Sequence, residues 1–139
     1  MIEINNLTAN PIDEKFLKRV ARKVLKSPSF AKAAEGEGKE FDLSIALVGP
    51  GRIKELNKKY RKKNRVTDVL SFLYNDSGEI IICPTKVKEN AKRFKSTFEK
   101  ELARVLIHGI LHLFGYDHEI SERKAKEMEE KQNYYLSKV

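Results

Sequence analysis

The chain has 139 residues, of which 40% are hydrophobic and 35% charged, and it carries a formal net charge of +8 and one cysteine, Cys83. No apolar run approaches the roughly 18 residues that a membrane-spanning helix needs, and the start of the chain lacks the basic head and apolar block of a signal peptide. A lone cysteine excludes an internal disulfide and fits a reducing compartment. We therefore expect one cytoplasmic domain over residues 1–139 that does not bind membranes. The net positive charge suggests a polyanionic partner.

The first half of the chain predicts alternating strands and helices. Residues 2–5 alternate as in an edge strand, and residues 13–26 place apolar side chains at helical spacing. A charged, glycine-bearing loop follows at 35–40. Residues 41–48 give the strongest strand signal of this half, after which Gly49-Pro50-Gly51 is expected to turn the chain. Residues 52–65 form a basic helix and its exit, with eight Lys or Arg against one acid, Glu55.

The second half predicts a strand pair followed by helices. Residues 67–72 and 79–83 have strand composition, and the turn residues 74–78 between them indicate an antiparallel pair whose second strand is central. A basic helix over 85–95 precedes a capped helix from about 98 to 114, which is apolar nearly all round and should be buried. A charged helix spans about 121–136. The order β-α-β-α-β-β-α-α-α predicts an α+β fold with a small mixed sheet of about four strands packed with helices.

All three histidines of the chain lie in one stretch, His108-Gly-Ile-Leu-His112-Leu-Phe-Gly115-Tyr-Asp-His118. On a helix, positions i and i+4 share a face with a rise of about 6 Å between them, so His108 and His112 can turn toward one point. Gly115 stands where the helix needs a positive φ to end, and the turn brings His118 toward the same point. A His-x3-His pair alone is more often chance or a satisfied core histidine. The third histidine favours a three-histidine metal site with an open position, typical of catalytic zinc, although nickel and copper also suit three imidazoles.

The histidine pattern is similar to the zinc-peptidase signature His-Glu-x-x-His-x-x-Gly-x-x-His, with one replacement. Gly109 stands where that signature has the glutamate that acts as general base. A peptidase without this glutamate lacks its proton acceptor for amide hydrolysis. Phosphodiester cleavage makes a different demand, because negative charge builds up on the phosphoryl oxygens, and a Lewis-acid metal together with a fixed cation can stabilise it.

Three blocks of the chain resemble the YbeY endoribonucleases, bacterial metal-dependent RNases of ribosomal RNA maturation. The stretch 108–118 is similar to the family's histidine signature. The other blocks are Leu56-Asn-x-x-Tyr60-Arg61 with Thr67-Asp-Val-Leu-Ser-Phe72, and Gly78-Glu-Ile-Ile-Ile-Cys83-Pro84. Asn64, Val66 and Glu79 depart from the family's usual Asp, Pro and Asp, and none of them is a predicted metal ligand.

This resemblance implies a zinc-bearing, single-strand-specific endoribonuclease that acts in 3′-end maturation of small-subunit ribosomal RNA and in ribosome quality control. It implies ribosomal RNA as substrate, and a small-subunit ribosomal protein and a ribosome-assembly GTPase as partners. By position, His108, His112 and His118 match the zinc ligands, and Arg61 matches the arginine needed for activity.

Arginine suits catalysis on phosphate because its planar fork meets phosphate oxygens bidentately. The alternative for Arg61 is one more surface cation of a basic helix. Asp68 and Asp117 are candidate bases, or partners that orient a histidine. If the basic stretches 52–65 and 85–95 both rim the metal cleft, they form a track for an RNA backbone. Two other functions remain open: a metallopeptidase of altered mechanism, and a ribosome-associated RNA-binding protein with structural zinc.

Overall fold

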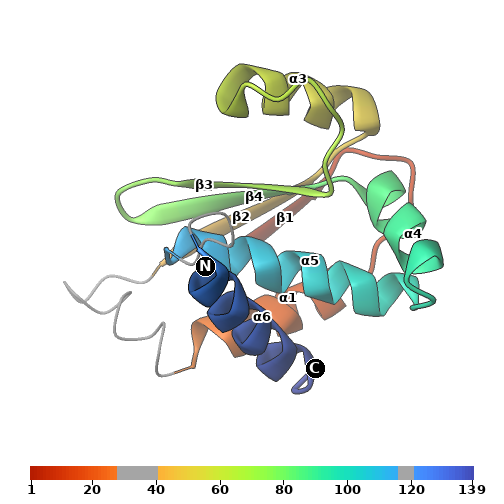
Figure 1. Ribbon diagram of the computed structural model, residues 1–139. Coiled ribbons are helices and arrows are strands. Elements are labelled where there is room, and N and C mark those ends of the chain that lie inside the picture. Colours follow the sequence, from red (N-terminus) through yellow and green to blue (C-terminus); the bar gives the residue numbers. More distant parts are fainter. Residues whose placement is uncertain (28–40, 116–120) are drawn as a thin grey trace.

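A mixed four-stranded sheet carries helices on both faces (Figure 1). The computed structural model describes residues 1–27, 41–115 and 121–139. In chain order its elements are β1 (Ile2–Asn6), α1 (Glu14–Leu25), β2 (Asp42–Leu47), α3 (Pro50–Arg61), β3 (Val69–Leu73), β4 (Ser77–Ile82), α4 (Pro84–Arg93), α5 (Phe98–Leu113) and α6 (Glu122–Leu136). This order and the single α+β domain agree with the prediction from sequence.

The strands lie in the order β1-β2-β4-β3, with β1, β2 and β4 parallel and β3 antiparallel to β4. β4 is therefore central, as predicted, and β1 and β3 are the edges. Side chains of β4 alternate between two apolar clusters: Ile80 and Ile82 face the cluster that includes α5, while Ile81 belongs to the cluster that includes Ile53 of α3. A strand buried on both faces needs apolar residues at successive positions, which explains its unbroken Ile-Ile-Ile run.

Two prolines begin helices where the sequence suggested only turns or strand ends. The prediction placed Gly49-Pro50-Gly51 in a turn and started the helix at residue 52, but α3 begins at Pro50 with Gly49 as its N-cap. Pro84 likewise begins α4, one residue before the predicted start. The first turn of a helix leaves its N–H groups without intrahelical partners, so a residue that lacks an N–H fits there.

Helix α5 lies under the sheet and is packed by α1, α4 and α6 (Figure 1). Thr97 caps its start, with Oγ1 accepting a hydrogen bond from the Lys100 N–H. Between residues 101 and 113, three side chains are not fully buried: Arg104, His108 and His112. They recur every four residues and thus form one half-buried stripe along an otherwise buried helix.

Several features predicted from sequence fall outside the described residues. They are the loop at 35–40, Asp117 and His118. No helix in the described part of the chain combines the length and apolar character needed to cross a membrane.

Candidate functional site

His108 and His112 turn their rings toward each other on the half-buried stripe of α5. Their ring centroids are 4.6 Å apart at an interplanar angle of 73°, and the two Nε2 atoms are 3.0 Å apart. The spacing of four residues produces this approach because both side chains lie on one helix face, one turn apart. The structure therefore brings together two of the three histidines singled out from sequence.

Gln132 of α6 fixes the orientation of His108. The Nδ1 atom of His108 donates a hydrogen bond to the Oε1 atom of Gln132 across 2.8 Å, and Gln132 is only 8% exposed. A proton on Nδ1 leaves Nε2 with its lone pair, the form of imidazole that binds a metal. Sequence reasoning did not single out Gln132. The available signal was a polar residue four positions after Met128, on the face of α6 that packs into the core.

The donor chemistry of this pair fits a divalent metal. Two imidazole nitrogens bound to one tetrahedral zinc at about 2.0–2.1 Å lie about 3.3 Å apart, close to the 3.0 Å between the two Nε2 atoms. Within the described ranges, no three His, Cys, Asp or Glu side chains come together as a metal site, and the predicted third ligand, His118, lies beyond those ranges. Gly115 does adopt the positive φ predicted for the helix end, +91°.

Gly109 lies where α5 touches the sheet. A Cβ atom at this position would come within 3.1 Å of the Ile80 Cγ2 atom and 3.2 Å of both the Ser71 Oγ and Val69 Cγ2 atoms. The Ser71 hydroxyl also donates a hydrogen bond of 2.9 Å to the Gly109 carbonyl. Glycine at this position therefore permits the close approach of helix and sheet. The glutamate of the peptidase signature would have to enter this contact.

Arg61, at the end of α3, is tied to the edge strand β3. Its Nη2 atom donates a hydrogen bond to the Ser71 carbonyl, and its guanidinium lies 5.2 Å from the centroid of the Phe72 ring. The hydrogen bonds from Cys83 N to Asp68 O and from Tyr74 N to Ser77 O place the even-numbered residues of β3 in the ladder with β4. The Ser71 carbonyl consequently points away from β4, where Arg61 reaches it.

Ser71 thus connects the catalytic candidate Arg61 to the histidine helix. Its carbonyl accepts from Arg61, and its hydroxyl donates to Gly109, the neighbour of His108. Sequence reasoning placed Ser71 in a strand without giving it a role. A serine in a strand carries no signal of a special role in the sequence. Its partner Gly109 becomes visible only when α5 is packed on β3.

Buried Asn57 holds the loop that follows α3. Its Nδ2 atom donates a hydrogen bond of 3.0 Å to the Arg65 carbonyl, and the backbone N–H groups of Lys62 and Lys63 both donate to the Asn57 carbonyl. Lys62 takes the left-handed conformation, with φ 61°, that closes such a helix end. The block that contains Asn57 and Arg61 therefore fixes where α3 stops and hence where Arg61 lies.

Asp68 belongs to a polar network around Arg104, which lies one turn before His108 on α5. Its Oδ2 atom accepts a hydrogen bond of 3.2 Å from Asn90 and lies 4.0 Å from Nη2 of Arg104. Arg104 is bound more closely by Glu101, whose two oxygens accept from Nε at 3.0 Å each. The hydrogen bonds from Arg104 to the Glu101 carboxylate raise the pKa of the guanidinium further above its ordinary value, so Arg104 stays charged. Among the described residues, the polar contacts of the Asp68 side chain are therefore with this network and with Thr67, and not with His108 or His112.

The two basic stretches approach the histidine helix from different sides. The body of α3 lies on the opposite face of the sheet from α5 (Figure 1), and the end of this helix reaches β3 through the Arg61 hydrogen bond to Ser71 and the Tyr60 ring beside Phe72. Helix α4 packs against α5 on the same side of the sheet. The two basic stretches therefore reach the histidine helix by different routes: α4 packs on α5 directly, and α3 is joined to it through Arg61 and Ser71.

Comparison with known proteins gives a consistent result. A family model described as endoribonuclease YbeY matches residues 3–139. An endoribonuclease YbeY of Thermotoga petrophila is 54% identical over 103 residues, which cover 72% of this chain and 69% of that protein. One from Petrotoga mobilis is 40% identical over 140 residues, covering 98% and 92%. Among solved structures, the solution structure of TM1509 from Thermotoga maritima is similar with a TM-score of 0.64 and 42% identity, covering 98% of this chain and 87% of that one.

Proposed function

This chain belongs to the endoribonuclease YbeY family and is an RNA-cleaving hydrolase, and from that premise we propose that it is a zinc-dependent, single-strand-specific endoribonuclease of small-subunit ribosomal RNA 3′-end maturation. The observation that supports this most is the pair of Nε2 atoms 3.0 Å apart on the half-buried stripe of α5. A rigid helix holding two neutral imidazoles at one point is what a catalytic metal site requires.

In this proposal His108, His112 and His118 hold the zinc, and Gln132 keeps the proton of His108 on Nδ1. A bound zinc supplies Lewis-acid stabilisation to a phosphoryl group. The role of Gln132 is to keep the His108 ring in the orientation and tautomer that metal binding needs, as carbonyl and carboxylate partners of ligating histidines commonly do.

Arg61 is proposed to bind the phosphate that is cleaved. Among the described residues its guanidinium makes one hydrogen bond, from Nη2 to the Ser71 carbonyl, so its remaining N–H groups are available to phosphoryl oxygens. The Phe72 ring beside it, at 5.2 Å, limits the positions of the planar fork. A preoriented cation stabilises transition-state charge without having to reorganise during the reaction.

Specificity for single strands is supported by exposed aromatic side chains beside cations. Tyr60 and Phe94 are both more than half exposed, with the Lys59 ammonium 5.2 Å from the Tyr60 ring and the Arg93 guanidinium 5.8 Å from the Phe94 ring. Unpaired bases stack on such rings, whereas bases within a duplex do not.

The family resemblance supports the rest of the proposal: ribosomal RNA as substrate, a small-subunit ribosomal protein and a ribosome-assembly GTPase as partners, and a cytoplasmic location. The lone Cys83 fits that compartment.

An RNA cleavage assay on wild type, Arg61→Ala and His112→Ala tests the proposal. We expect Arg61→Ala to retain metal and lose about 10²- to 10³-fold in kcat, and His112→Ala to lose metal and cleavage together. Comparing a single-stranded RNA with its duplex tests the strand specificity, and mapping of small-subunit RNA 3′ ends in cells that lack the protein tests the proposed substrate.

The same assay separates the alternatives. RNA binding without cleavage by any of the three proteins would indicate an RNA-binding protein with structural zinc. Hydrolysis of casein by the wild type would indicate a peptidase. Such a peptidase would need a general base from elsewhere, because position 109 is a glycine in close contact with the sheet.

A further inference from the structure

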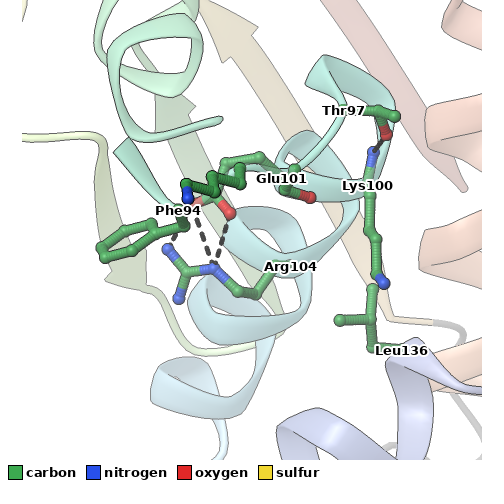
Figure 2. A pocket seen from close by; sticks show the side chains of 8 residues that line it. Phe94, Thr97, Lys100, Glu101, Arg104 and Leu136 are labelled. Atoms are coloured by element: carbon green, nitrogen blue, oxygen red, sulfur yellow. Dashed lines mark hydrogen bonds and ion pairs between the residues drawn. The ribbon is translucent and has the colours of Figure 1, made fainter. Parts of the chain in front are cut away.

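A pocket of about 530 Å³ opens between the start of α5, the end of α4 and the end of α6. Figure 2 draws the side chains of its lining residues and labels Phe94, Thr97, Lys100, Glu101, Arg104 and Leu136. Lys100 extends beside Leu136 of α6, while Glu101 and Arg104 lie toward Phe94. Lys95 also lines the pocket.

The pocket has an excess of positive charge. Its one acid, Glu101, is 3% exposed and already bound to Arg104. The Nη1 group of Arg104 has no hydrogen-bond partner among the residues that the structure describes, and the exposed ammonium groups of Lys95 and Lys100 form no ion pair with any of them. Because Arg104 and Glu101 neutralise each other, Lys95 and Lys100 supply the net positive charge of the lining, which favours an anionic ligand.

An exposed aromatic ring lies at the edge of this basic pocket. Phe94 is 59% exposed, and the Arg93 guanidinium lies 5.8 Å from the centroid of its ring. The combination of an open aromatic face with nearby cations is the arrangement by which proteins bind single-stranded nucleic acid, the ring stacking on a base and the cations contacting phosphates.

The pocket and the histidine pair lie one helical turn apart on α5. Arg104 of the pocket is one turn, about 6 Å, before His108 on the half-buried stripe of α5. The facing helix repeats this step, because Leu136 of α6 lines the pocket and Gln132, four residues earlier, binds His108. The pocket is therefore close enough for a strand held at the histidines to reach it.

We propose that this pocket is a subsite for the RNA segment that flanks the cleaved phosphate. Lys95, Lys100 and Arg104 contact a neighbouring phosphate of the strand, and Phe94 stacks on a base. The inference rests on the proposed function, since it names where the substrate of that same site continues. The buried Glu101 has the separate task of holding the Arg104 guanidinium in place.

The first test removes one lysine charge and compares it with a matched control. Lys100→Gln alters the pocket, whereas Lys15→Gln alters an exposed lysine in the equally capped first turn of α1. Binding of a fluorescent, 2′-O-methylated single-stranded RNA of about 12 nucleotides is measured on the metal-loaded proteins over a range of salt concentrations. We expect Lys100→Gln to reduce the slope of log affinity against log salt by about 0.7, and Lys15→Gln to leave it unchanged.

The second test removes the aromatic ring. Phe94→Ala is compared with Tyr134→Ala, because Tyr134 is similarly exposed, at 57%, and also lies beside a cation, Lys138. We expect Phe94→Ala to weaken binding of the same RNA by about fivefold or more with no change in salt slope, and Tyr134→Ala to have no effect. Both substitutions are at exposed positions, and circular dichroism confirms that each variant is folded.

These outcomes separate the subsite from the proposed function. Equal effects within each pair of variants overturn the subsite, even when the wild type cleaves RNA. Unequal effects as expected support it, even when no RNA is cleaved, in which case the proposed nuclease function fails alone.

Discussion

His108 and Gln132 form a hydrogen bond of 2.8 Å from Nδ1 to Oε1, and this bond joins the buried helix α5 to the last helix of the chain. It determines which nitrogen of His108 can bind a metal, because the proton on Nδ1 leaves the lone pair on Nε2. A residue 24 positions away from His108 therefore decides the chemistry of the predicted ligand.

Gln132→Leu is predicted to weaken metal binding by about 10- to 100-fold, because His108 loses the acceptor that fixes its tautomer. Gln132→Glu is expected to keep the affinity, since a carboxylate accepts the same hydrogen bond. Competition with a chromophoric chelator measures both. Asn133→Leu is the control, because its side chain is exposed on the same helix. Equal affinity of Gln132→Leu and Asn133→Leu would contradict a role for Gln132.

Removal of one predicted ligand should remove the metal. We expect purified wild type to contain about one divalent metal ion per chain, and His112→Ala to contain almost none, because two imidazoles bind zinc far more weakly than three. Elemental analysis of protein purified without chelator measures this and also identifies the metal. Equal metal content in the two proteins would count against the site.

Gly109→Ala is predicted to lower the free energy of unfolding by about 1–3 kcal/mol. The added Cβ would come within 3.1–3.2 Å of side chains from Val69, Ser71 and Ile80, and the sheet and core hold these in place. Gly51→Ala, in the first turn of α3, is the control, because nothing beyond its chain neighbours and the backbone of its own helix lies within 4 Å of the added Cβ. Helix propensity should stabilise that variant by up to about 1 kcal/mol. Urea unfolding of both variants measures the difference, and equal shifts would show that α5 and the sheet are not in close contact.

Arg61→Lys is predicted to lower kcat for RNA cleavage by about 10- to 100-fold. Lysine keeps the charge but lacks the planar fork that binds phosphate bidentately and lies against Phe72. Metal content should not change, since Arg61 contacts Ser71 and Phe72 rather than a predicted ligand. Steady-state cleavage of a single-stranded RNA measures this effect. Full activity of the lysine variant would show that position 61 needs only a positive charge.

Burial raises the pKa of the Cys83 thiol above its ordinary value. The unfolded chain therefore loses the thiol proton at a lower pH than the folded protein does. The contribution of the protonated thiol is fully present below the unfolded pKa of about 8.5 and decreases as the pH rises toward the folded pKa.

Over this alkaline range we expect wild type to lose up to about 1.4 kcal/mol of stability per pH unit relative to Cys83→Ala. The cavity made by the substitution lowers stability equally at each pH, so it does not change the slope. Chemical unfolding of both proteins from neutral to alkaline pH measures the effect. Parallel curves would show that the thiol titrates alike in the folded and unfolded protein.

The sequence by itself determined the order of the elements, the buried character of α5 and the approach of His108 to His112. These features follow from local physics: hydrophobic periodicity sets which side chains are buried, and a spacing of four residues places two rings on one helix face. The turn at Gly115 was also predictable, because a positive φ suits glycine.

Only the tertiary structure decided which residues support these groups. Gln132 reaches His108 because α6 folds back along α5, Ser71 joins Arg61 to Gly109 because β3 lies beside α5, and the basic body of α3 lies on the far face of the sheet (Figure 1). Each relationship joins segments far apart in the chain, so no local pattern of side chains encodes it, and it arises when separate apolar faces are buried together.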